Sequence, residues 1–91
     1  MEHNLLKQVF DTLQDKSMII AMEELAELQQ AISKGIRGKL DKDNLTEEIA
    51  DVYIVLDWIK SYFSVDDEEL AKWYKYKENR IVDRLNRGEL R

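Results

Sequence analysis

The sequence predicts an all-α fold, an antiparallel helical bundle of about four helices per chain that is completed by homo-oligomerisation. The chain of 91 residues has no Pro, three Gly and 36% charged residues, a composition that favours helices. Apolar side chains recur every three or four residues in four stretches, which is the spacing of amphipathic helices. The breaks between these stretches are short, so successive helices are expected to run antiparallel.

Chain length and charge restrict the possible functions. A chain this short forms one domain, residues 1–91, and buries only about 60–65% of its unfolded surface. Without Cys it has no disulfide, so we expect at least a dimer. The net charge of -5 disfavours a nucleic acid polymer as partner. The chain has neither a membrane-span pattern nor a signal-peptide pattern, so we expect no membrane contact and a cytoplasmic location.

The first two predicted helices cover residues 4–13 and 18–34. The first is short and amphipathic, and we expect it to pack as a lid on the others. Asp15 or Ser17 can cap the start of the second helix. Gly35 is predicted to end it, since glycine is the commonest residue just past a helix.

The last two predicted helices cover residues 45–62 and 67–86. Asn44, followed three residues later by Glu47, resembles a capping box at the start of the third helix. Asp66 or Ser64 can cap the fourth. The side chains of the fourth helix expected to point inward are Leu70, Trp73, Tyr76 or Lys77, Ile81 and Leu85.

Two acidic clusters interrupt the apolar pattern, one in each central helix. Side chains three residues apart share a helix face, so Glu24 pairs with Glu27. Glu48 pairs in the same way with Asp51. Because the loop at 35–43 is short enough to make an antiparallel hairpin, the four carboxylates are expected to meet at one level of the bundle.

Two facing pairs of carboxylates need positive charge. Each close contact between them costs about 4 kcal/mol at an effective dielectric constant of about 20, unless protons or cations neutralise it. Mg²⁺, with Mn²⁺ as an alternative, prefers such oxygen ligands. A solvent-exposed helix surface remains the alternative interpretation of either cluster taken alone.

The sequence lacks the residues that other kinds of catalytic centre need. A dinuclear iron bundle needs Glu-x-x-His pairs, and the one histidine, His3, lies far from both clusters. No Cys or His lies near a serine that could act as a nucleophile. The segment from Gly35 to Gly38 lacks the spacing of a phosphate-binding loop and the Lys-Ser/Thr that follows it.

The double motif resembles a known family. Glu23-Glu24-x-x-Glu27, followed about twenty residues later by Glu48-x-x-Asp51, is similar to the signature of the MazG-like all-alpha nucleoside triphosphate pyrophosphohydrolases, especially the small phage-type members. The resemblance implies a homodimer or a dimer of dimers with Mg²⁺ held by the four paired carboxylates. It also implies hydrolysis of a (deoxy)nucleoside triphosphate to the monophosphate and pyrophosphate.

Two further acids each have alternative roles. Glu23 lies about 100° around the helix from Glu24, where it can act catalytically by positioning or deprotonating the attacking water. Ligation of a second ion and simple surface exposure are the alternatives. Glu47 can pair with Asp51, but its position in the expected capping box favours a structural role.

The triphosphate implied by the resemblance requires cations. On the last helix, Lys77 and Arg80 match the pattern of the phage-type members. Lys75 and Asn79 instead match the Lys-x-x-x-Asn spacing of other members, and both registers stay open. Arg37, in the loop after the second helix, is a further candidate for binding phosphate.

Two functions without catalysis compete with the hydrolase. One is a catalytically silent bundle that binds a nucleotide or a partner protein. The other is a structural oligomerisation bundle whose acids are solvated. Residues 14–17, where a base preference is often set in the family, show no pattern that indicates a particular base.

Overall fold

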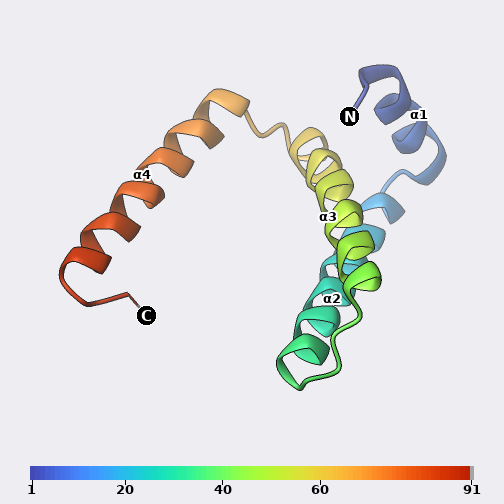
Figure 1. The fold of residues 1–91 in the computed structure, drawn as a ribbon. Coiled ribbons are helices and arrows are strands. Elements are labelled where there is room, and N and C mark those ends of the chain that lie inside the picture. Colours follow the sequence, from blue (N-terminus) through green and yellow to red (C-terminus); the bar gives the residue numbers. More distant parts are fainter. Residues whose placement is uncertain (91) are drawn as a thin grey trace.

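The chain folds into four α-helices, as the computed structural model shows for residues 1–90 (Figure 1). The helices are α1 (His3–Leu13), α2 (Lys16–Ile36), α3 (Lys42–Tyr62) and α4 (Asp67–Asn86). No strand occurs within these 90 residues, so the all-α prediction is confirmed. Within the same part of the chain, no helix combines the length and the apolar character needed to cross a membrane.

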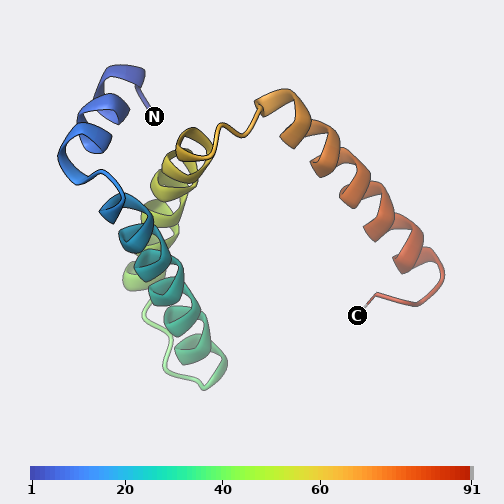
Figure 2. The same cartoon turned by 180° about the vertical axis from the view of Figure 1, so that it is seen from behind.

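Helices α2 and α3 lie side by side and antiparallel in both views (Figure 1, Figure 2). The buried side chains of this hairpin are small: Ser17, Ala21, Ala31, Val52 and Val55. Small side chains let the two helix backbones approach closely. The acidic residues of α2 lie between Ala21 and Ala31, at the centre of the hairpin.

The end of α2 differs from the prediction. The helix continues through Gly35 to Ile36 and turns at Gly38, whose φ of 80° is the left-handed conformation that favours glycine. The amide of Lys39 donates to the carbonyl of Lys34 at 2.8 Å, which closes the last turn. Gly35 was therefore the wrong stop signal, because the residue that ends the helix is the glycine with a positive φ.

The start of α3 also differs from the prediction. The helix begins at Lys42, because the Asp41 carboxylate accepts a hydrogen bond from the amide of Asn44 at 3.0 Å. The expected capping box of Asn44 and Glu47 is wrong, since Asn44 already lies inside the first turn. Glu47 is exposed and has no capping role.

At the start of α2, Ser17 is not a cap. It lies inside the helix, is fully buried, and donates its hydroxyl to the carbonyl of Gln14 at 2.7 Å. Asp15 occupies the cap position but makes no capping hydrogen bond. Its carboxylate instead accepts a hydrogen bond from the Tyr62 hydroxyl, which fastens the end of α3 to the start of α2.

Helix α1 packs at one end of the hairpin. The Phe10 ring lies 6.1 Å from the Tyr62 ring, measured between centroids, and α1 contacts the start of α2. The predicted lid therefore lies at the end of the hairpin where α2 begins and α3 ends (Figure 1). The acidic residues of α2 lie nearer the centre of the hairpin.

Helix α4 has the predicted bounds but stands away from the hairpin (Figure 1, Figure 2). None of its side chains is buried. The radius of gyration is 16.4 Å, against about 12 Å for a compact domain of this length. The prediction that these side chains point into a bundle is thus wrong within one chain, where they are exposed: Leu70, Trp73, Tyr76, Lys77, Ile81 and Leu85.

Candidate metal centre

Three carboxylates meet at the centre of the hairpin. Glu24 and Glu27 of α2 and Glu48 of α3 each offer one oxygen, and these oxygens lie within 4.8 Å of one another. The three-residue spacing puts the first two on one face of α2, and the hairpin loop brings α3 against that face. The sequence had predicted this convergence from spacing alone.

Asp51 is the fourth predicted ligand. It lies half-buried one turn after Glu48, outside the group of oxygens within 4.8 Å. Its charge nevertheless raises the pKa of both Glu24 and Glu48, which places it in the same electrostatic environment. All four predicted acids therefore belong to one region of the hairpin.

Two carboxylate oxygens of this cluster are buried without a partner. Glu24 Oε2 and Glu48 Oε2 are shielded from solvent and accept no hydrogen bond. Most buried polar atoms in proteins have a partner, so each of these atoms requires an explanation. A proton shared with Glu27, or a cation, can supply the missing positive charge.

Burial and mutual repulsion change how these acids ionise. Desolvation, followed by the charges of Glu27 and Asp51, raises the pKa of Glu24 to about 7 from an ordinary value of 4.5. The same causes, in the same order, raise the pKa of Glu48. The raised pKa of Glu24 and Glu48 means that the ionised form of these two acids is disfavoured unless positive charge is supplied.

The donor set fits a hard divalent cation. All the donors are carboxylate oxygens, which Mg²⁺, Mn²⁺ and Ca²⁺ prefer, and no His or Cys belongs to the cluster. Oxygens on opposite sides of one ion stand about 4.2 Å apart around Mg²⁺ and about 4.8 Å apart around Ca²⁺. The limit of 4.8 Å on the spacing of the three oxygens equals the span around Ca²⁺ and exceeds that around Mg²⁺, so a common Mg²⁺ would draw the three side chains slightly closer together. The two oxygens without partners are available as ligands.

The two neighbouring acids are exposed. Glu23 lies beside Glu24 on α2 but faces solvent, so it can reach a group bound over the cluster without being part of it. Glu47 is exposed next to Glu48.

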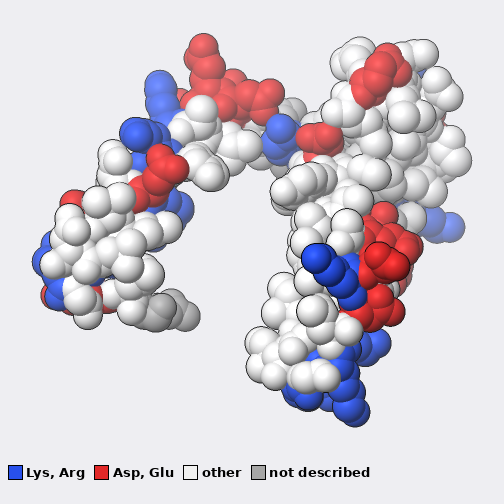
Figure 3. All heavy atoms as spheres, in the orientation of Figure 1, with Lys and Arg blue, Asp and Glu red and all other residues white. Residues whose placement is uncertain are grey.

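Basic side chains gather at the loop end of the hairpin (Figure 3). Arg37 follows directly after α2, and its guanidinium Nε donates to the carbonyl of Ser33 at 3.3 Å. It lies ten residues beyond Glu27, about 15 Å along a helix. The structure therefore does not bring Arg37 into contact with the carboxylates.

The predicted cations of α4 are also remote from the carboxylates within one chain, because α4 stands apart (Figure 1). At about 100° per residue, Lys77 falls on the same side of α4 as Trp73 and Ile81. Lys77 Nζ lies 5.9 Å from the centroid of the Trp73 ring. Arg80 is half-buried at the edge of this side.

The alternative register lies on the opposite side of α4. Lys75 and Asn79 are turned by about 120° to 160° from Lys77 and Ile81. Lys75 Nζ pairs with Glu78 at 3.5 Å on that exposed surface. The two registers left open by the sequence thus occupy different faces, and only Lys77 and Arg80 accompany apolar side chains.

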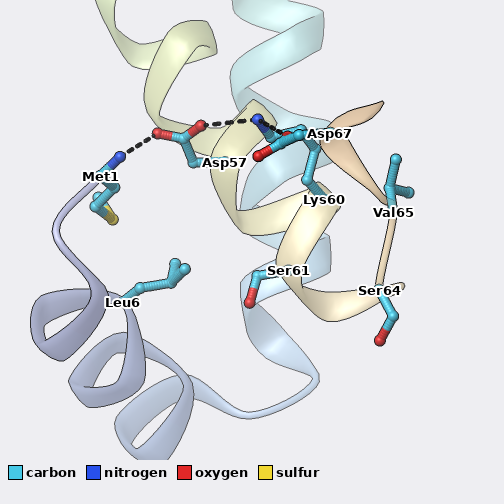
Figure 4. A pocket seen from close by; sticks show the side chains of 8 residues that line it. All are labelled: Met1, Leu6, Asp57, Lys60, Ser61, Ser64, Val65 and Asp67. Carbon is cyan, nitrogen blue, oxygen red and sulfur yellow. Dashed lines mark hydrogen bonds and ion pairs between the residues drawn. The ribbon is translucent and has the colours of Figure 1, made fainter. Parts of the chain in front are cut away.

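A second polar site, which the sequence did not indicate, lies at the junction of α1, α3 and α4 (Figure 4). Asp57 accepts a hydrogen bond from the amino group of Met1 at 2.7 Å, which lowers its pKa. Lys60 pairs with Asp67 at 3.0 Å, which raises the pKa of Lys60. The cavity beside them is lined by Met1, Leu6, Asp57, Lys60, Ser61, Ser64, Val65 and Asp67.

This junction is distant from the carboxylate cluster along α3, with Asp57 six residues beyond Asp51. Its charges are paired, and its polar contacts join segments far apart in the sequence. Such contacts leave no periodic signal in the sequence.

A scan against protein-family models finds no match for this chain, and searches of curated proteins and of solved structures find no similar protein.

Proposed function

We propose that this protein is a Mg²⁺-dependent nucleoside triphosphate pyrophosphohydrolase, which converts a (deoxy)nucleoside triphosphate to the monophosphate and pyrophosphate. The observation that carries the proposal is the convergence of Glu24, Glu27 and Glu48 with two buried oxygens that lack partners. The double acidic motif, which resembles that of the MazG-like enzymes, indicates the reaction.

In this proposal Glu24, Glu27, Glu48 and Asp51 hold Mg²⁺, with Mn²⁺ as a substitute. A divalent ion bound there would offset charge on the phosphate oxygens and lower the pKa of a coordinated water. Glu23 faces solvent beside these ligands, where its carboxylate can accept a proton from the attacking water.

Positive side chains of α4 would bind the phosphates. We assign this role to Lys77 and Arg80, because they lie on or beside the apolar face of the helix, whereas Lys75 and Asn79 lie on the opposite face. Arg37 is left as a peripheral contact, since its guanidinium is held against the end of α2. Lys supplies a point charge and Arg a planar pair of donors, and both suit phosphate.

The decisive experiment is a panel of nucleoside and deoxynucleoside triphosphates incubated with the protein and Mg²⁺, with pyrophosphate as the readout. We expect pyrophosphate and the matching monophosphate from at least one substrate, and none when EDTA replaces Mg²⁺. Release of orthophosphate in place of pyrophosphate would contradict cleavage between the α and β phosphates.

A catalytically silent bundle is the second candidate, favoured by the separation of α4 from the carboxylates. It would bind a nucleotide or a partner protein and release no pyrophosphate from any member of the panel. A purely structural bundle would in addition show no rise in melting temperature with Mg²⁺, because a ligand that binds only the folded state stabilises it.

We also propose that the protein is a homo-oligomer, a dimer or a dimer of dimers. The exposed apolar side chains of α4 support this, since a helix of this composition needs a covering surface.

A further inference from the structure

One side of α4 forms an apolar stripe, with Lys77 within it, that nothing in residues 1–90 covers. Five side chains fall within about 120° of the helix circumference. All five are between 44% and 70% exposed. They are Leu70, Trp73, Tyr74, Ile81 and Leu85. A monomer rarely leaves such a row of large apolar side chains in water.

The hairpin carries an uncovered apolar row of its own. On α3, Ile49, Tyr53 and Leu56 follow one another at helical spacing, and Tyr53 is 70% exposed. On α2, Ile19 and Met22 are exposed in the same way. Helix α3 has 21 residues and α4 has 20, so the two helices are of nearly equal length.

The exposed area has the size of a dimer interface. The solvent-accessible surface is 7479 Å², whereas a compact monomer of 10.8 kDa exposes about 5,500 Å². Covering this excess in two chains would bury nearly 4,000 Å², within the range of about 2,000–5,000 Å² that obligate homodimers bury. A second copy of the chain is an occupant of sufficient size.

Charge selects the surface on which α4 would dock. The segments 17–33 and 43–59, which form the middle of the hairpin, contain no Lys or Arg. Residues 72–87 carry six basic and two acidic side chains. Pairing of α4 with a second α4 would therefore bring like charges together, whereas docking on a hairpin places this excess of positive charge beside carboxylates.

The junction between α3 and α4 disfavours closure onto the chain's own hairpin. The Lys60–Asp67 ion pair of 3.0 Å ties the last turn of α3 to the first residue of α4. The amide of Val65 donates to the carbonyl of Lys60 at 2.8 Å, and Ser64 has a φ of 55°. These contacts lie at the connection that sets the direction of α4, and α4 stands away from the hairpin of the same chain (Figure 1).

We infer that α4 is an exchanged arm, which docks through its apolar stripe on the α2–α3 hairpin of a second copy of this chain and places Lys77 and Arg80 beside that copy's carboxylates. Two copies exchange arms reciprocally, so the interface closes on itself. The inference concerns assembly and holds whether or not the carboxylates catalyse a reaction.

The first test compares two aspartate substitutions on α4. Ile81→Asp puts a charge in the stripe, and Asn79→Asp puts the same charge on the opposite face. In sedimentation at micromolar concentration we expect dimers or larger closed assemblies for the wild type and for N79D, and monomers for I81D. A monomeric wild type, or an I81D protein that assembles like the wild type, overturns the inference. Because Ile81 is exposed in the chain, circular dichroism should show unchanged helix content.

The second test locates the arm. The chain has no Cys, so single cysteines can be introduced without background. Chains with Ile81→Cys are assembled with heavier, isotope-labelled chains carrying Ile49→Cys, Tyr53→Cys or Leu56→Cys, and treated with a short bismaleimide. We expect a cross-link between a light and a heavy chain.

Two other products overturn the arm exchange. A dominant link between two copies of I81C indicates pairing of α4 with α4. A dominant link within a single chain that carries both cysteines indicates closure onto its own hairpin. Lys75→Cys, on the far face of α4, is the matched control and should give few links to any hairpin position.

Discussion

The α2–α3 hairpin and α4 are built from helices of nearly equal length, yet they differ in which side chains they bury. The hairpin buries small side chains together with carboxylate oxygens, and it exposes a row of apolar residues on its outside. Helix α4 buries nothing and carries cations within and beside an apolar stripe. Each region therefore lacks what the other has, which is the pattern expected of two surfaces that meet in an assembly.

The comparison also separates two kinds of amphipathic helix. In α2, the face toward α3 holds Ser17, Ala21 and Ala31, residues too small to drive folding by themselves. In α4, the exposed stripe holds large aromatic and aliphatic groups, which gain about 1.5–3 kcal/mol each when fully buried. The larger apolar gain thus remains available for association.

The largest expected effect concerns the hairpin. Glu24→Gln removes a carboxylate whose orphaned oxygen is available to a metal, and we expect pyrophosphate release to fall more than about 100-fold, since even residues that only support metal ligands cost 10–100-fold. Glu47→Gln, on an exposed neighbour of Glu48, should keep at least half of the activity. Full turnover by E24Q with every good substrate would remove the carboxylate cluster from the mechanism.

A mixed dimer tests whether the two regions act together across copies. One chain carries Glu24→Gln and the other carries Lys77→Gln with Arg80→Gln, and differently tagged chains are purified as the heterodimer. Exchange of arms restores one complete site of the two, so we expect about half of the wild-type activity per dimer. A heterodimer no more active than the mean of its parents would show that α4 acts within its own chain.

The two faces of α4 should differ in substrate binding. Lys77→Gln removes a cation from the apolar face, and we expect KM to rise about 10-fold, the loss of one charge-assisted contact. Lys75→Gln, on the opposite face, should change KM less than about twofold. If the two substitutions raised KM equally in steady-state kinetics, the position of Lys77 on the apolar face would not be what makes it bind the phosphates.

Two matched valine substitutions compare packing. Val55 in the hairpin is 2% exposed, and Val55→Ala should lower the free energy of unfolding by about 1–3 kcal/mol. Val82 on α4 lies outside the stripe and is half exposed. Val82→Ala should therefore change the free energy of unfolding by less than about 0.5 kcal/mol. Urea denaturation measures the change in the free energy of unfolding for both variants. A larger loss for V82A than expected would mean that a second side of α4 is also covered.

The smallest expected effect is on thermal stability. A pKa of Glu24 raised to about 7 contributes stability that is fully present below about pH 4.5 and is lost as the pH rises through 7. The metal-free protein should therefore melt several degrees lower at about pH 8 than at about pH 5. The lowered pKa of Asp57 does not affect this comparison, because the stability that it contributes is lost only at a more acidic pH.

Calorimetry with and without Mg²⁺ checks this prediction. Mg²⁺ should raise the melting temperature more at the higher pH, where the carboxylates are ionised. Glu24→Gln should reduce both the pH dependence and the response to Mg²⁺, and Glu47→Gln should leave both in place. A melting temperature that does not change between the two pH values would contradict the raised pKa.

The sequence by itself determined the four helices and the meeting of the carboxylates. The bounds of α4 follow from Asp66, and the approach of Glu24 to Glu48 follows from three-residue spacing on two helices joined by a short loop. The helix bounds and the pairing of acids on each helix depend on interactions within a few residues, which periodicity and capping rules describe well. The approach of the two helices follows from the short loop between them. The errors at Gly35 and at Asn44 were also local, since each had a competing signal within three residues, Gly38 and Asp41.

Only the tertiary structure decided where α4 lies and which of its cations share a side with the apolar stripe. The direction of α4 depends on a short connection, on the φ of Ser64 and on one ion pair between Lys60 and Asp67. None of these leaves a periodic trace in the sequence, because a few backbone angles in a loop redirect a whole helix without changing its pattern. A helix of fixed amphipathicity can therefore complete its own chain or a second copy, and the geometry of the loop determines which.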